Sequence, residues 1–271
     1  MRDVRKTRRR PLQSCEHSLF EIQELAAIQG ALRGLYPMTV AENIEHVRER
    51  IAAAARRSSR RPEEITLMAV TKTFPPQRIR EAHAGGIRIF GENRVQEFAG
   101  KADAVRDLAD AQWHMIGHLQ NNKAGKAAEL FTAVDSVDCV KLARRLNAAA
   151  QKLNKELAML IEVNIAGEEG KSGLAPESPE LQAILDAARD LTNVKIRGLM
   201  TIPPWAEDPE RSRPFFRQLR QLRDRIAACK YPTVAMDVLS MGMSHDFEVA
   251  IEEGSTCVRV GTAIFGARTK T

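Results

Sequence analysis

From Thr39 onward the chain alternates short apolar runs with stretches of helical periodicity, and this alternation constrains the fold more than any other feature. The apolar runs have the length and composition of parallel strands buried on both faces. They are residues 65–72, 87–93, 113–117, 133–137, 158–165, 195–203, 238–244 and 257–266. Segments with apolar residues at spacing three and four, such as Val140, Ala143 and Leu146, follow the first seven runs. This order predicts right-handed crossovers and a parallel sheet.

Eight such units predict an α/β protein that closes into a single (β/α)8 TIM-like barrel. The length of 271 residues agrees with the roughly 250 that such barrels need. Residues 40–57 predict an extra helix before the first strand, and we expect no C-terminal β-domain after residue 266. An open doubly wound sheet is the alternative, but both its fingerprint GxGxxG and the P-loop motif are absent.

Residues 1–38 precede the alternating pattern and are basic. Residues 1–37 hold seven Arg or Lys and four acids, so they contribute +3 (7 − 4) of the net charge of +6. The segment lacks the apolar core of a secretory signal, and Glu16, Glu21 and Glu24 argue against a transit peptide. The stretch that starts at Met38, MTVAENIEHVRERIAAAA, has the pattern of a complete helix N-terminus. We therefore interpret residues 1–38 as a basic extension, either disordered or translated from an upstream start codon, and residues 39–271 as the barrel domain.

The net charge of +6 and the isoelectric point near 9.3 raise the question of nucleic-acid binding. Outside residues 1–37 the charge is only +3 (6 − 3), and nine Phe, two Trp and two Tyr offer few surfaces for base stacking. We expect no nucleic-acid partner. No apolar run reaches the roughly 18 residues of a membrane span, so we expect no membrane insertion either.

The four cysteines, Cys15, Cys139, Cys229 and Cys257, are far apart and form no CxxC pair. They predict neither a zinc site nor a disulfide framework, which favours a reducing cytoplasm. A closed barrel leaves no free sheet edge, and no exposed apolar stripe marks a dimer face. We therefore expect a monomer.

Polar residues recur where the predicted strands end. In barrels of this kind the functional residues gather at the carboxyl ends of the strands. Here those ends carry Lys72, Asn93, His118, Ser136, Asn164, Thr201, Ser244, Gly261 and Thr262. The alternative is that strand ends are polar only because loops are polar.

The last two strands predict a phosphate site. "MGMS" ends the seventh run and "GTAIFG" lies within the eighth, which places Gly242, Ser244, Gly261 and Thr262 side by side. Barrels frequently bind phosphate there through backbone N–H groups that glycine lets approach closely. The alternative is that the glycines relieve crowding at the barrel seam.

Lys72 ends the first strand, which neighbours the eighth once the barrel closes. Lysine is rarely buried without a partner, and one that is partly removed from water becomes a nucleophilic amine. An amine beside a phosphate site suits pyridoxal 5′-phosphate (PLP), which has an aldehyde and a phosphate. It equally suits an aldolase that forms a Schiff base with a sugar phosphate, and spacing does not separate the two.

Six ordered motifs make the chain resemble a known family. They are "AVTKTFPPQRIREAHAGGIRIFGENRVQE", "WHMIGHLQNNK", "KSGL", "RGLMTIP", "LSMGMSHDFEVAIEEGST" and "VRVGTAIFGAR", and they span about residues 40–268. Together they are similar to the pyridoxal phosphate homeostasis protein family. The resemblance implies a fold like the barrel domain of alanine racemase. It also implies a PLP-binding protein that maintains supply of the vitamer, with no generally accepted turnover.

The resemblance also implies the cofactor-binding residues. Lys72 in "AVTKT" matches the lysine that holds PLP as an internal aldimine, and Asn93 in "FGEN" matches a position near the cofactor. Three more residues, Ser244, Gly261 and Thr262, match phosphate-binding positions. Arg259 in "VRVG" matches an arginine near the pyridine ring, and a surface or salt-bridge arginine is the alternative.

The sequence favours a carrier with little or no turnover over a PLP-dependent racemase or lyase acting on small amino acids. An arginine can only donate to the pyridine nitrogen, which weakens carbanion stabilisation. A racemase needs a second acid/base group on the other face. Tyr36 and Tyr231 are poorly placed for this role, and His118 is the strongest substitute, although a structural loop histidine is its favoured interpretation. Lys171 is either a solvated lysine or a site for a second anion or for PLP in transfer. PLP-dependent apo-enzymes are the expected acceptors.

Overall fold

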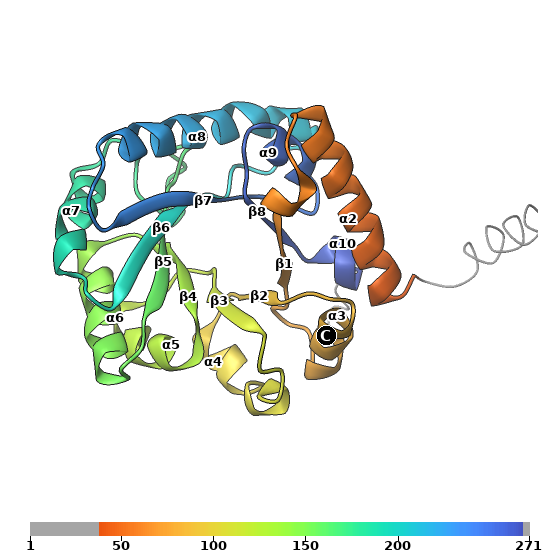
Figure 1. Cartoon of the computed structure of the whole chain (residues 1–271), viewed down its shortest axis with the longest axis horizontal. Helices are drawn as coiled ribbons and strands as arrows, with labels where there is room; N and C mark the ends of the chain where they lie inside the picture. The colour runs from red at the N-terminus through yellow and green to blue at the C-terminus, as the bar shows by residue number, and fades with distance from the viewer. Residues whose placement is uncertain (1–37, 268–271) are drawn as a thin grey trace, which may run out of the picture. The chain divides into compact units, whose positions relative to one another are not determined.

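The computed structural model describes residues 38–267, so the interpretation of residues 1–37 lies outside the described residues. The chain divides after Thr39, and the unit that begins at Val40 is a closed barrel of eight parallel strands in chain order, with β1 paired to β8 (Figure 1). The strands are β1 (Thr66–Val70), β2 (Ile89–Glu92), β3 (Gln112–Met115), β4 (Ala133–Val137), β5 (Leu157–Glu162), β6 (Val194–Met200), β7 (Val234–Met243) and β8 (Cys257–Val260). The predicted TIM-like barrel is confirmed.

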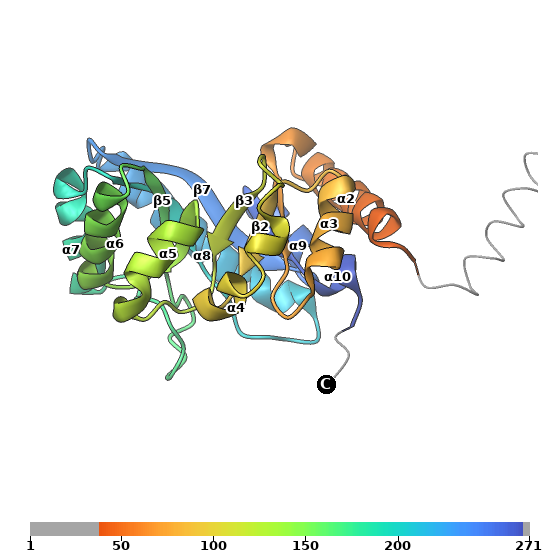
Figure 2. The same ribbon diagram turned by 90° about the horizontal axis from the view of Figure 1, so that it is seen from below.

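Helices surround the strands on the outside of the barrel (Figures 1 and 2). They are α2 (Val40–Arg57), α3 (Pro76–Ala84), α4 (Val95–Ala99), α5 (Ala124–Leu130), α6 (Val140–Lys152), α7 (Pro179–Ala187), α8 (Arg213–Ala228), α9 (Phe247–Glu252) and α10 (Thr262–Phe265). The extra helix predicted at residues 40–57 is therefore confirmed as α2. None of the helices within residues 38–267 has the length and apolar character of a membrane span.

The predicted eighth strand extends furthest beyond the observed one. The eighth was expected to run to Gly266, but β8 ends at Val260 and Thr262 begins α10. The chain turns at Gly261, and the backbone N–H groups of Ile264 and Phe265 donate to the Gly261 carbonyl. The apolar residues of "TAIF" do not distinguish a strand from a helix, because Ile264 and Phe265 could be buried in either structure.

The hydrophobic core lies mainly between the strands and the surrounding helices, as in other barrels of this class. A smaller cluster of Met68, Val70, Ile116 and Cys257 comes from β1, β8 and the end of β3. Because side chains alternate along a strand, Arg259 shares the face of Cys257 on β8. This face carries both apolar and charged groups.

Helix α2 ties the start of the barrel domain to its end. Asn43 donates through Nδ2 to the Ile264 carbonyl at 2.9 Å, and the Arg50 guanidinium makes two hydrogen bonds of 2.9 Å to the Glu248 carboxylate. Figure 1 shows α2 beside α9 and α10. The contact with Ile264 holds α10, which directly follows Gly261, and the contact with Glu248 holds α9.

Candidate functional site

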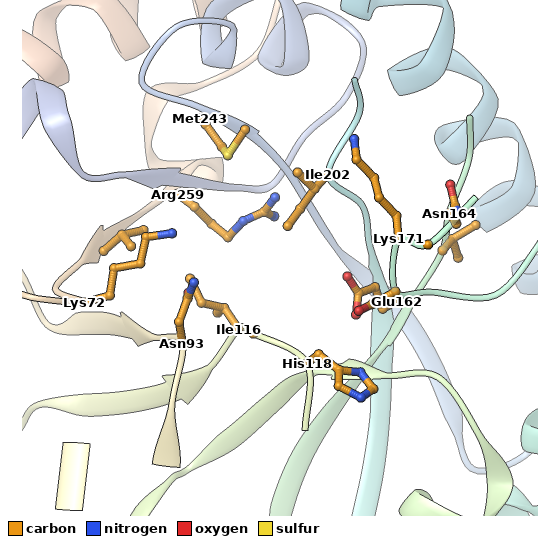
Figure 3. A pocket seen from close by; sticks show the side chains of 15 residues that line it. Lys72, Asn93, Ile116, His118, Glu162, Asn164, Lys171, Ile202, Met243 and Arg259 are labelled. Atoms are coloured by element: carbon orange, nitrogen blue, oxygen red, sulfur yellow. The ribbon is translucent and has the colours of Figure 1, made fainter. Parts of the chain in front are cut away.

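A cavity of about 410 Å³ lies at the carboxyl ends of the strands (Figure 3). Its lining includes the predicted site residues Lys72, Asn93 and Arg259, together with Val70, Ile116, Gly117, His118, Glu162, Val163, Asn164, Gly170, Lys171, Ser172, Ile202 and Met243. Three of the predicted residues, Ser244, Gly261 and Thr262, do not line it. Lys72 and Asn93 lie at one end in Figure 3, Glu162, Asn164 and His118 at the other, and Arg259 between them.

Lys72 is carried by a loop that a buried ion pair holds in place. Lys101 Nζ lies 2.9 Å from Glu92 Oε1 and donates to the Thr71 carbonyl at 3.0 Å, directly before Lys72. The hydroxyl of Thr71 also donates to Glu92 Oε1, at 2.5 Å. Thr73 then turns with a φ of 67°, which is unusual for a β-branched residue. The contacts to Lys101 and Glu92 fix the backbone that presents the Lys72 amine.

Asn93 follows β2 and meets the chain at Gly117 after β3. A Cβ atom at Gly117 would lie 2.4 Å from the Asn93 carbonyl oxygen, closer than real Cβ atoms come. Only glycine therefore allows the two loops to approach this closely. This approach sets the position of Asn93 at the wall of the cavity.

Arg259 is buried, with 3% of its surface exposed, so the alternative in which it lies at the surface is wrong. Its Nη1 donates to Ser240 Oγ at 2.7 Å and its Nη2 to the Thr201 carbonyl at 2.8 Å. Burial lowers the pKa of the guanidinium below its ordinary value, and nearby acidic groups, among them Asp135, act in the opposite direction. Arginine still carries its charge in proteins. Arg259 is thus a fixed, buried cation in the lining of the cavity.

The predicted phosphate residues lie together next to the cavity. Ser244 Oγ accepts hydrogen bonds from the backbone N–H of Gly261 at 3.2 Å and of Ala263 at 3.3 Å. A Cβ atom at Gly261 would lie 3.5 Å from Val70, which lines the cavity. Thr262 is exposed. A hydroxyl and two backbone donors thus converge beside the Lys72 end.

The remaining polar strand-end residues divide into two groups. Ser136 donates to the Gly117 carbonyl at 2.6 Å and Thr201 to the Val163 carbonyl at 2.6 Å, so both hold strand ends together. His118 lines the cavity, with Nδ1 3.4 Å from an Asp138 oxygen. Lys171 also lines the cavity, is exposed, and pairs with Glu168.

Sequence reasoning missed Glu162. It is the last residue of β5, is 6% exposed and lines the cavity, and its Oε2 has no hydrogen-bond partner within the described part of the chain. Burial raises the pKa of Glu162 to about 7, with a further increase from Asp138 and an opposing effect of Arg259. The available signal was one acid inside the apolar run "AMLIEVNI", whose end was assigned to Asn164 instead.

Comparisons with known proteins identify the family. The family described as alanine racemase, N-terminal domain, matches residues 42–269. A pyridoxal phosphate homeostasis protein of Aquifex aeolicus is 47% identical over 231 residues, covering 85% of this chain and 99% of that protein. One of Pseudomonas aeruginosa is 44% identical over 230 residues, covering 85% and 96%.

The chain belongs to the pyridoxal phosphate homeostasis protein family. A solved structure of PipY from Synechococcus elongatus with PLP bound is 38% identical, with a TM-score of 0.73, and covers 84% of this chain and 100% of that one. An alanine racemase of Clostridium difficile shares the fold, with a TM-score of 0.63 at 12% identity. The resemblance found in the six motifs is therefore confirmed for family and fold.

Proposed function

We propose that this chain binds PLP through Lys72 and serves in intracellular PLP homeostasis, with little or no turnover. The observation that carries the proposal is the joint placement of the Lys72 amine and the buried Arg259 cation in one cavity, with the Ser244–Gly261 cluster beside it. Two similarities support it: the relatives named pyridoxal phosphate homeostasis protein, and the PipY structure with PLP bound.

The residues present fit this cofactor. The cavity of about 410 Å³ falls in the usual range for small-molecule sites. Lys72 would hold the aldehyde, because its amine condenses with a carbonyl and releases water. Ser244, Gly261 and Thr262 would hold the phosphate; the Ser244 oxygen accepts from the N–H groups of Gly261 and Ala263, which leaves its hydroxyl proton to donate. Asn93 and Arg259 would contact the ring.

The same residues argue for a carrier. PLP supplies an aldehyde and an electron-withdrawing ring, and the ring withdraws electrons best when a carboxylate keeps its nitrogen protonated. Arg259 only donates, and its fixed positive charge disfavours a second positive charge on a nearby nitrogen. We infer that this arrangement keeps turnover low.

A PLP-dependent racemase or lyase acting on small amino acids is the second candidate. The observation that favours it is the imidazole of His118 in the cavity, beside Asp138. Incubation of PLP-loaded protein with single L-amino acids in deuterated water separates the two functions. We expect no rapid exchange at Cα; rapid exchange or formation of the D-isomer would make the chain an enzyme.

We further propose that the protein acts as a monomer in the cytoplasm and that PLP-dependent apo-enzymes accept its cofactor. Mixing the PLP-loaded protein with an apo-enzyme and recording recovered activity tests acceptance. With a scavenging amine present in both mixtures, activity should recover faster from the PLP-loaded protein than from the same amount of free PLP. Equal rates would show that transfer goes through free PLP.

The absorption spectrum from 300 to 500 nm tests the role of Lys72. Wild type with added PLP should show a band near roughly 420 nm that borohydride reduction removes. The Lys72→Ala variant should lack this band, whereas Lys195→Ala, at a partly exposed lysine on β6, should retain it. A wild type that stays colourless with PLP would overturn the proposal and favour the Schiff-base aldolase.

A further inference from the structure

The cavity has a second polar end that the proposed cofactor residues do not explain. Glu162 ends β5, which lies across the closed barrel from β1, the strand that leads to Lys72. In Figure 3 its carboxylate points into the cavity, opposite the Lys72 end. Glu162 is not one of the residues that would hold an aldehyde, a phosphate or a pyridine nitrogen.

The Glu162 carboxylate lacks a full set of hydrogen-bond donors. Its Oε2 is buried and accepts no hydrogen bond from any residue within 38–267. Buried polar atoms are nearly always paired, because an unpaired one has lost its water without replacement. A donor from outside the chain would remove this penalty.

The charged groups around Glu162 do not supply that donor. The two Nη groups of Arg259 donate to Ser240 and Thr201. Lys171 pairs with Glu168, and His118 lies 3.4 Å from Asp138. The residues that line or influence this end therefore include cations, but none of them donates a hydrogen bond to Glu162 Oε2.

We propose that the Glu162 end of the cavity is a subsite for the ammonium group of a small primary amine, with Glu162 as its counter-ion. An ammonium group carries three donors and one positive charge, which matches a carboxylate with an unmet acceptor. Ile116, Val163 and Ile202 line the same cavity and suit a short aliphatic chain. The subsite goes beyond the proposed function because it assigns a second ligand, and it does not depend on PLP binding at Lys72.

The subsite should be sensitive to pH. Ammonium binding needs the ionised carboxylate, and burial raises the pKa of Glu162 to about 7. Four charged or titratable groups from other segments face or influence it: Asp138 after β4, His118 after β3, Arg259 on β8 and Lys171 after β5. Asp138 disfavours the ionised form and Arg259 favours it. Affinity for an ammonium ion should therefore rise as the pH increases from 5.5 to 8.

Calorimetric titration of n-propylammonium chloride into the full-length Lys72→Ala protein at pH 8 tests the proposal. This background removes the cofactor lysine, so failure of PLP binding and failure of the subsite are separate results. We expect saturable binding, at least tenfold weaker after an additional Glu162→Gln change, and unaltered by Glu129→Gln at an exposed acid. Propionate, the matched anion, should not bind.

A pH series on the protein with Glu162 intact provides a second measurement should the Glu162→Gln variant not fold. Binding of n-propylammonium should weaken at least tenfold between pH 8 and pH 5.5. The proposal is overturned if n-propylammonium does not bind, if propionate binds in its place, if the affinity is the same at both pH values, or if Glu162→Gln binds as tightly as its parent.

Discussion

Two buried glutamates, on strands β2 and β5 of the barrel, differ in what surrounds them. Glu92 on β2 receives the Thr71 hydroxyl and the Lys101 ammonium on its Oε1 and does not line the cavity. Glu162 on β5 lines the cavity, and within residues 38–267 no lysine forms an ion pair with it, although Arg259 influences its pKa. Burial raises the pKa of both carboxyl groups, and Lys101 opposes the effect only at Glu92.

The difference separates a structural carboxylate from one that is available to a ligand. A buried ion pair with supporting hydrogen bonds is costly to break, because removal of one partner leaves a charge without compensation. At Glu162 the effect of burial outweighs the attraction of Arg259, so this carboxyl group takes up a proton near neutral pH. Oε2 of both glutamates lacks a hydrogen-bond partner within residues 38–267, but only Glu162 lines the cavity. Glu92 thus helps to position Lys72, whereas Glu162 offers its acceptor to a ligand.

The largest effect is expected at the Glu92 end. Lys101→Met should lower the free energy of unfolding by about 3–5 kcal/mol, because it leaves the Glu92 carboxylate buried without its cation. Urea denaturation at pH 8 measures this difference. The control is Lys126→Met, which removes an exposed pair with Glu129. Similar small losses in the two variants would contradict the structural role of the Glu92–Lys101 pair.

At the Glu162 end the effect should depend on pH. The pKa of Glu162 in the folded state, about 7, lies above its ordinary value of 4.5, so the folded protein binds the proton of this carboxyl group more tightly than the unfolded protein does. The resulting stabilisation is complete below about pH 4.5 and is lost as the pH rises through about 7. It amounts to about 3 kcal/mol.

Glu162→Gln removes this dependence. The variant should unfold with nearly the wild-type free energy at pH 4.5 and be more stable than wild type by up to about 3 kcal/mol at pH 8. Denaturant titrations across this pH range give the difference directly. A constant difference between the two proteins at all pH values would show that Glu162 titrates normally.

A smaller loss is expected where the two strand-end loops meet. Gly117→Ala would place a Cβ atom 2.4 Å from the Asn93 carbonyl oxygen, and such overpacking costs about 1–3 kcal/mol. Gly125→Ala is the matched control, because Gly125 lies in α5 and a Cβ there meets nothing within 4 Å. This control should gain about 0.5–1 kcal/mol. Thermal unfolding that shows no loss for Gly117→Ala would disprove the close approach.

The smallest effect is expected at Lys171. It pairs with Glu168 three residues away, and both side chains are more than a third exposed. Lys171→Ala should therefore change the free energy of unfolding by less than about 0.5 kcal/mol. Urea denaturation of Lys171→Ala and Lys101→Met under the same conditions compares the loss of unfolding free energy at an exposed pair with that at a buried pair. A loss of several kcal/mol would mean that the loop after β5 contributes to the stability of the barrel.

Much of the fold and part of the site could be predicted from the sequence. The order of apolar runs predicted the barrel, because strands that are buried on both faces must be apolar along most of their length. Lys72, Asn93 and Arg259 were named and lie in the cavity. The predicted end of the eighth strand was wrong, because the three apolar residues Ala263, Ile264 and Phe265 suit a strand or a helical turn.

Periodicity and motifs by themselves determined the family, the closed barrel and the lysine at the end of β1, since these depend on local composition and spacing. Only the tertiary structure decided which charges are compensated. Lys101 reaches Glu92 from beyond α4, whereas Glu162 and Arg259 come together only because β5 and β8 contribute to one cavity. Burial and distance set the energy of a charge, and a linear sequence contains neither.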